Sequence, residues 1–345
     1  MRSAKHIAQL FLLILLVSGV NGQDLHFSQY FNAPLLVNPA NTGFMPDHDY
    51  RFGGNYRSQW SNLGGNPYKT MSAWGDGQLF YNRIETGWVG IGGALLNDVA
   101  GAGNLTSVRA FASVAYHQLL NENSLLSAGF GLSYVNKRVD VTKLSFDDQW
   151  NGKFFDITIN PNEPFAHSSV SYLDLQLGIN YAYFASDNVY LNAGVSVMHL
   201  NSPSESFFAA NATTTQQLDR RYTAFLNSNI KIQNLWIINP NLYVSKMGTA
   251  WEALIGATAS RNISGDGATQ LILGLYYRND DALIPVIGYQ LNDLKVTVNY
   301  DATISSLGTY NGTQGAYEIS IVKSGIYSAL GKASRAVKCP KVVRF

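Results

Sequence analysis

Three glycines in the stretch WVGIGG, at residues 88–93, are the first residues whose spacing could serve chemistry. A glycine-rich loop that binds a nucleotide needs a strand before it and a helix after it, so that the phosphate meets the helix N-terminus. Here Gly90, Gly92 and Gly93 lie within an alternating strand pattern. Glycine inside a strand favours close packing or curvature, so we predict no nucleotide site.

Acidic residues gather further along the chain, at Asp147, Asp148 and Asp156, with Asn151 and Gly152 between them. Oxygen-rich loops of this kind can hold calcium. The spacing matches no EF-hand loop, however, and no bidentate Glu follows at the required distance. The favoured interpretation is a solvated loop, and we predict no metal and no cofactor.

The histidines do not form a catalytic motif, because they are scattered along the chain and none is paired with Ser or Asp in a recognisable pattern. Neither His-Glu-x-x-His nor Gly-x-Ser-x-Gly occurs. A triad assembled in space stays open as an alternative, but we predict that the protein is not an enzyme. The net charge of +1 gives no electrostatic reason to expect nucleic acid as a partner.

The N-terminus has the pattern of an export signal. Arg2 and Lys5 precede an apolar stretch at 7–17, and the small residues Val20 and Gly22 suit cleavage before Gln23. The alternative, a membrane anchor, needs about 18 apolar residues. We therefore predict a signal peptide at 1–22 and, because no later segment is long and apolar enough for a membrane helix, a barrel if the mature chain lies in a membrane.

Alternation of apolar and polar residues is the main structural signal along the chain. It persists over residues 171–183 and recurs at 126–134, 189–197 and 296–301. This period indicates long strands with one apolar and one polar face. The expected strands are 50–60, 70–80, 87–98, 105–119, 124–138, 170–185, 188–199, 220–231, 235–246, 250–261, 269–278, 281–291, 294–304 and 315–323.

Strand length and connections favour an outer-membrane barrel over the rival fold, a soluble β-sandwich. Many of the expected strands reach the ~9–11 residues that cross a bilayer, whereas soluble strands average ~5–6. The two long gaps, 139–169 and 200–219, follow odd-numbered strands, where the external loops of a barrel belong. We predict an all-β, transmembrane, antiparallel up-and-down β-barrel of about 14 strands at 50–323, in the outer membrane of a Gram-negative cell.

Aromatic residues provide a weaker indication of a membrane barrel. We expect a ring of aromatic side chains at the membrane interfaces. Its members would be Trp60, Trp74, Trp88, Tyr116, Tyr134, Tyr243, Trp251 and Tyr276.

Two segments flank the expected barrel. Residues 23–49 are irregular, since their prolines disfavour a central strand, and they carry apolar side chains that should not face water together. We expect this segment to enter from the periplasmic side and to pack at the periplasmic rim or in the lumen. The tail, 324–345, has no acidic residue and is expected in the periplasm, either as a solvated end or bound to an acidic partner or anionic lipid. Its basic residues include Lys332, Arg335, Lys338, Lys341 and Arg344.

The irregular segment carries a family resemblance. Gln23-Asp24, Phe27-Ser28-Gln29-Tyr30, Ala33-Pro34, Asn38-Pro39-Ala40 and Thr42-Gly43, then Asn55-Tyr56-Arg57-Ser58-Gln59-Trp60, resemble the PorP/SprF family of Bacteroidetes. Asn299-Tyr300-Asp301, Gly315-Ala316-Tyr317-Glu318 and Cys339-Pro340 resemble its closing strands and tail. Ala316 departs from that pattern, in which a second glycine is common.

The resemblance implies a component of the type IX secretion system. Members are similar either to a core protein coupled to the periplasmic ring of the secretion and gliding machinery, or to dedicated partners of secreted adhesins. Expected partners are therefore an adhesin C-terminal domain, periplasmic ring or linker proteins, and outer-membrane lipid. The rival function is a diffusion channel or hydrophobic-solute transporter. The candidate residues for partner binding or barrel packing are Phe27, Tyr30, Phe31, Pro34, Asn38, Pro39, Arg57 and Trp60.

Overall fold

The computed structural model describes residues 27–45, 47–61, 67–80, 83–156, 158–159, 168–207, 217–306 and 308–327. The predicted signal peptide and nearly all of the predicted tail lie outside these residues. The strands are β1 (Tyr50–Gln59), β2 (Tyr68–Leu79), β3 (Gly87–Ala100), β4 (Leu105–Asn121), β5 (Ser124–Arg138), β6 (Ser169–Ser186), β7 (Val189–Met198), β8 (Arg221–Ile232), β9 (Trp236–Met247), β10 (Ala250–Asn262), β11 (Thr269–Arg278), β12 (Ala282–Leu291), β13 (Leu294–Thr303) and β14 (Gln314–Gly325).

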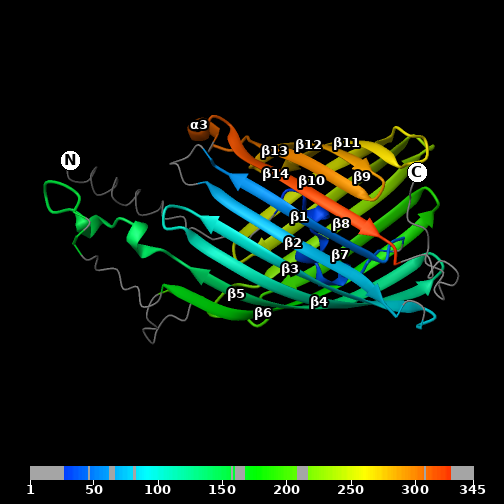
Figure 1. Cartoon of the computed structure of the whole chain (residues 1–345), viewed down its shortest axis with the longest axis horizontal. Coiled ribbons are helices and arrows are strands. Elements are labelled where there is room, and N and C mark those ends of the chain that lie inside the picture. The colour runs from blue at the N-terminus through cyan, green and yellow to red at the C-terminus, as the bar shows by residue number, and fades with distance from the viewer. Residues whose placement is uncertain are drawn as a thin grey trace, which may run out of the picture.

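These strands form a closed, antiparallel barrel in which every strand pairs with its neighbours in sequence (Figure 1). Closure is made by β1 and β14, whose register runs from Tyr50 opposite Gly325 to Gln59 opposite Ala316. The predicted barrel is confirmed, and each strand begins and ends within two residues of its expected position. None of the helices in the described residues has the length and hydropathy to span a membrane.

The two ends of the barrel differ. We call one the turn end, because it carries the short connections after even-numbered strands and both termini of the sheet. The opposite, loop end carries the connections after odd-numbered strands, including the long ones between β5 and β6 and between β7 and β8. It also carries α3 (Gly308–Asn311) (Figure 1). In bacterial barrels long loops face the exterior and short turns the periplasm.

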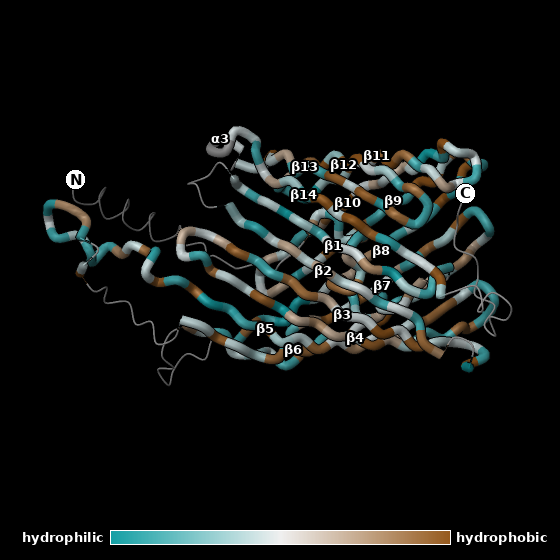
Figure 2. Tube along the Cα trace, in the orientation of Figure 1, coloured by the Kyte–Doolittle hydropathy of each residue, from teal (hydrophilic) through white to brown (hydrophobic). Residues whose placement is uncertain are grey.

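The strand faces are reversed relative to a soluble protein, with polar side chains inside and apolar ones outside. Along β6, Asp174, Gln176 and Asn180 are buried in the lumen, while Leu173 and Ile179 are exposed on the outer face. Figure 2 shows the resulting alternation of hydropathy along the strands. An apolar outer face suits contact with lipid.

Residues 27–45 lie inside the barrel, where we call them the lumen segment. In Figure 1 they form the deep blue segment between the strands. They contain three short helices, η1 (Tyr30–Asn32), α2 (Pro34–Val37) and η2 (Pro39–Asn41). Pro34 and Pro39 occupy the first positions of their helices, where the missing N–H costs nothing.

The expected aromatic ring is wrong for four of its members. Trp74, Trp88, Tyr243 and Tyr276 are buried in the lumen. Alternation along their strands places these side chains on the inner face, where the lumen segment lies; the Trp88 indole, for example, donates to the carbonyl of Gly43 at 2.9 Å. Of the expected ring, Tyr116, Tyr134 and Trp251 are exposed on the outside of the barrel.

Candidate functional site

The lumen segment begins at a buried hydroxyl that joins three charged side chains. The Ser28 hydroxyl donates to Asp301 Oδ2 at 2.7 Å and accepts from Arg57 Nη1 at 2.7 Å and Arg278 Nη2 at 2.5 Å. One donor and two acceptors are all that a hydroxyl offers. Ser28 is therefore fully used in holding the segment against the barrel wall.

The surrounding charges form a network of opposite signs in the half of the lumen near the loop end. Arg57 Nη2 lies 2.9 Å from Asp301 Oδ2, and Arg57 Nη1 lies 3.3 Å from Glu318 Oε2. Arg278 Nη2 lies 3.1 Å from Asp301, and its Nε lies 3.2 Å from Glu252. Buried charges are tolerated only when they are paired and hydrogen-bonded, and these pairs come from β1, β10, β11, β13 and β14.

Glu318 also holds the backbone of the lumen segment. Its two carboxylate oxygens accept from the amides of Ser28 at 2.9 Å and Gln29 at 3.0 Å. The Gln29 side chain then donates to Asn299 Oδ1 at 2.6 Å and accepts from Asn32 at 2.7 Å. Side chains of the closing strands thus recognise main-chain and side-chain groups of the segment together.

The middle of the segment rests on a part of the wall that is free of side chains. Asn38 donates to the carbonyls of Ile179 at 3.0 Å and Val195 at 3.1 Å. This approach requires glycine, because a Cβ on Gly178 would lie 1.9 Å from Asn38 Oδ1 and a Cβ on Gly129 would lie 2.4 Å from the amide nitrogen of Ala40.

The same close approach explains the glycines of WVGIGG. A Cβ on Gly90 would lie 1.9 Å from the carbonyl oxygen of Thr42, and one on Gly92 would lie 2.9 Å from Leu35. The prediction of close packing there is confirmed. Glycine is the only residue that lets another backbone come this near.

The Thr42 carbonyl is also recognised by His117. The carbonyl oxygen can only accept, so His117 Nε2, at 2.8 Å, carries the hydrogen. The opposite ring nitrogen, Nδ1, lies 2.7 Å from the Ser127 hydroxyl. One residue further, the amide of Gly43 donates to Asp76 Oδ2 at 2.6 Å. The last turn of the segment is thereby fixed near the turn end.

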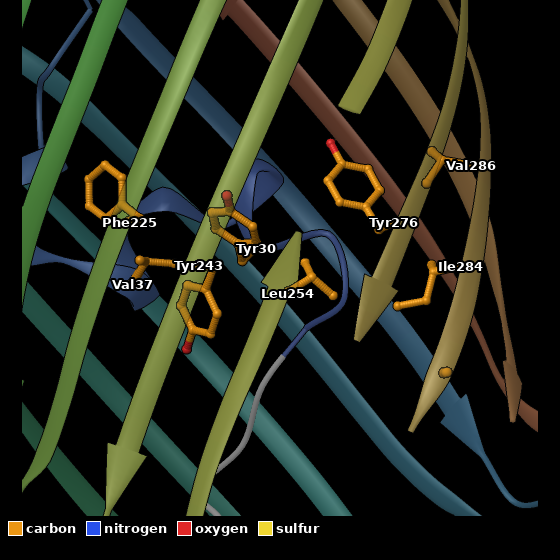
Figure 3. Packing of buried hydrophobic residues seen from close by; sticks show 9 residues of the cluster. Tyr30, Val37, Phe225, Tyr243, Leu254, Tyr276, Ile284 and Val286 are labelled. Atoms are coloured by element: carbon orange, nitrogen blue, oxygen red, sulfur yellow. The ribbon is translucent and has the colours of Figure 1, made fainter. Parts of the chain in front are cut away.

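Apolar contacts complete the attachment (Figure 3). Tyr30 and Val37 of the segment pack into a cluster with Phe225, Tyr243, Leu254, Tyr276, Ala282, Ile284 and Val286 from β8 to β12. The ring centroids of Tyr30 and Tyr243 are 4.8 Å apart, and Phe31 stacks on Tyr276 at 5.4 Å. Burial raises the pKa of the Tyr30 phenol well above its usual range, and the hydroxyl donates to Asn227 Oδ1 at 2.9 Å.

A cavity of about 780 Å³ remains between the lumen segment and β7 to β14, together with Arg51 of β1, on the side of the turn end. The segment contributes Tyr30, Phe31 and Val37 to its wall, and the strands contribute many amides, such as Asn192 and Asn239. Among the described residues, no group of three or more His, Cys, Asp or Glu is placed to hold a metal ion.

The structure brings most of the predicted candidate residues together. Phe27, Tyr30, Asn38, Pro39 and Arg57 are buried in the lumen. Phe31 and Pro34 line the cavity. Trp60 lies apart at the loop end, where it packs edge-on against Tyr68 at 5.0 Å between ring centroids. The basic candidates of the tail, 332–344, lie outside the described residues.

Sequence reasoning missed several residues that hold the segment. Asp301 and Glu318 stand in the stretches that carried the family resemblance, yet they were not chosen as site residues. Arg278 and Gly178 had no local signal at all. Alternation along their strands places both positions on the inner face, and closure of the barrel then brings them beside the lumen segment.

Substitution Gly90→Ala is expected to displace the Thr42–Gly43 turn, because the new methyl group would overlap the Thr42 carbonyl. We expect destabilisation of about 1–3 kcal/mol, typical of overpacking, measured as a lower temperature of the gel-shift transition from folded to unfolded barrel. The matched control is Gly75→Ala on the outer face of β2, where the nearest atom to a Cβ is an ordinary 3.4 Å away. Equal transition temperatures for the two variants would contradict the close approach.

These features, a closed barrel with an apolar outer face and a polar lumen, define an outer-membrane β-barrel protein. The family model described as type IX secretion system membrane protein PorP/SprF matches residues 19–322. The chain therefore belongs to the PorP/SprF family. No match is found among curated proteins.

Solved structures share the fold at low sequence identity. The TodX monoaromatic hydrocarbon channel deltaS2 mutant has a TM-score of 0.51 at 10% identity, over 84% of this chain and 93% of that one. The CymD monoaromatic hydrocarbon channel has a TM-score of 0.48 at 10% identity, over 90% of this chain and 96% of that one. The KdgM porin has a TM-score of 0.37 at 9% identity, over 79% of this chain and 98% of that one. The likeness to the TodX mutant shows the fold alone.

Proposed function

We propose that the protein is a non-enzymatic outer-membrane component of the type IX secretion system that docks adhesin-type substrates through their C-terminal domains. It would help export these substrates or hold them at the cell surface. Its turn end would face periplasmic ring or linker proteins of the secretion and gliding machinery, and its apolar outer face would contact lipid. Membership of the PorP/SprF family supports this proposal.

The observation that carries the proposal is the occupied lumen. Residues of the segment are tied to the wall at Ser28, Asn38 and Thr42, through partners on widely separated strands. Moving the segment out of the lumen would break this attachment and would expose buried charges and unpaired polar groups. A barrel filled in this way is better suited to be a rigid support for protein partners.

The rival function is a diffusion channel or hydrophobic-solute transporter. The likeness to the TodX mutant, a monoaromatic hydrocarbon channel, and the cavity of about 780 Å³ favour it. Two measurements on the purified, detergent-solubilised barrel separate the functions.

We expect the wild-type barrel to bind the C-terminal domain of an exported adhesin from the same organism and to show no stepwise conductance in a planar bilayer. Binding would be measured by surface plasmon resonance, with a fragment of the same adhesin that lacks the C-terminal domain as the control analyte. Stable conductance steps without binding would support the channel and contradict the docking role.

A further inference from the structure

The connection between β5 and β6 projects beyond the ends of the strands at the loop end. Figure 1 shows it as the green segment that reaches furthest from the barrel among the described parts of the chain. Its base is attached to the neighbouring connection, where the amide of Asp140 donates to the carbonyl of Gly103 at 2.8 Å. Because loop ends of bacterial barrels face outward, this connection extends away from the membrane.

Beyond its base the connection is organised by its own hydrogen bonds. Gln149 is buried; its side-chain oxygen accepts from the amide of Phe146 at 3.0 Å, and its side-chain nitrogen donates to the carbonyl of Ile159 at 3.0 Å. The Asn151 side chain accepts from the amides of Lys153 and Phe154 at 3.0 and 3.1 Å. A loop that is organised before binding loses less conformational entropy when a partner arrives.

This organised loop presents three large aromatic side chains to solvent. Trp150, Phe154 and Phe155 are 54%, 59% and 47% exposed. Trp150 and Phe155 form an antiparallel bridge, which places their side chains on the same face. Exposed aromatic side chains that share a face, as those of Trp150 and Phe155 do, mark interaction sites, and Trp is prominent among residues that dominate binding energy.

The charge of the loop indicates what kind of surface it fits. Residues 144–159 contain Asp147, Asp148 and Asp156 but only one basic residue, Lys153. Hydrogen bonds from Thr158 hold the pKa of Asp156 below its usual range, so this carboxylate stays ionised. An acidic rim repels an anionic membrane surface, and it equally repels a second copy of the same loop.

We propose that Trp150, Phe154 and Phe155 form a docking surface for the C-terminal domain of the exported substrate. The complementary surface on that partner domain is an apolar groove framed by Lys and Arg. The acidic rim selects a basic protein partner over lipid or self-association. This inference rests on the proposed docking function and adds to it the contacting loop and the charge of the partner.

The test compares binding of the purified adhesin C-terminal domain to full-length barrels by surface plasmon resonance. We expect the triple variant Trp150→Ser, Phe154→Ser, Phe155→Ser to raise Kd at least ~100-fold, and Phe154→Ser alone to raise it ~10-fold, as for aromatic hot spots. The matched control is Ile304→Ser, a 55% exposed apolar residue in another loop-end connection, which should leave Kd unchanged. The gel-shift transition should be the same for all of these variants, because the loop lies outside the barrel wall.

A second arm tests the charge of the partner. Asp147→Asn with Asp156→Asn is expected to lower the association rate ~10-fold at low salt and to flatten its dependence on ionic strength, as for electrostatically steered encounters. Equal binding by wild type and the aromatic triple variant would overturn the loop assignment and leave the docking function standing. An association rate independent of salt would overturn the basic charge assigned to the partner's groove. Absence of binding to the wild-type barrel would overturn both the loop assignment and the docking function.

Discussion

Deletion of residues 27–45 is expected to open the barrel and to lower its resistance to unfolding. Leu35 and Phe27 are buried against the wall, and complete burial of side chains of this kind contributes about 1.5–3 kcal/mol each. The deletion also leaves Glu318 without the two amides that it accepts from. We therefore expect a lower gel-shift transition temperature together with stable conductance steps in a planar bilayer.

A second variant separates occupancy of the lumen from chain length. Replacing residues 27–45 with a glycine-serine segment of equal length keeps the chain but removes its contacts. It should behave like the deletion in both measurements, because flexible polar chains gain no burial. A variant that retains the wild-type transition temperature and shows no conductance would contradict a structural role of the lumen segment.

The barrel wall could be predicted from the sequence because its signal is local. Along each strand, the period of two separates a lipid face from a lumen face, and stretches such as 171–183 carry it without interruption. The connections provided the remaining information, since Asn and Asp mark short turns. Strand number and strand ends follow from these two features alone.

The aromatic residues show how to predict which face of the barrel a side chain occupies. Its place in the strand's alternation, which we call its parity, is a better guide than its distance from the strand end. Trp74 shares the parity of Asp76 and Gln78, and all three side chains are buried in the lumen. The expected aromatic ring was based on positions toward strand ends or on outward positions, and the inward-facing Trp74 in the middle of β2 meets neither criterion. Parity would have assigned it to the same face as its polar neighbours.

The attachment of the lumen segment could not be predicted in detail, because its contacts join distant parts of the chain. Ser28 and Glu318 are 290 positions apart, and they meet because the lumen segment lies against β14 inside the closed barrel. Asn38 was a candidate from its motif, but the sequence does not show that Gly178 lies opposite it. Such pairs depend on the register of the whole barrel.

Substitution Arg57→Ala is the second change with a large expected effect. It removes the partner that Glu318 and Asp301 share, at a site where all three side chains are nearly inaccessible to solvent. Removing one member of a buried ion pair typically costs about 3–5 kcal/mol, because the remaining charge is left uncompensated. We expect a destabilisation of this size, measured from the urea dependence of unfolding in detergent or lipid.

Two further substitutions test whether the loss arises from the network. Arg83→Ala removes an exposed guanidinium that lies over the Phe80 ring at 5.9 Å, and a surface change of this kind should stay within about 0.5 kcal/mol. Ser28→Ala keeps every charge but leaves Asp301 without the hydroxyl donor, which should cost about 1–3 kcal/mol. Because Arg57 donates to that same hydroxyl, the Arg57→Ala and Ser28→Ala effects should not add in the double variant. Strict additivity would mean that Arg57 stabilises the wall independently of the lumen segment.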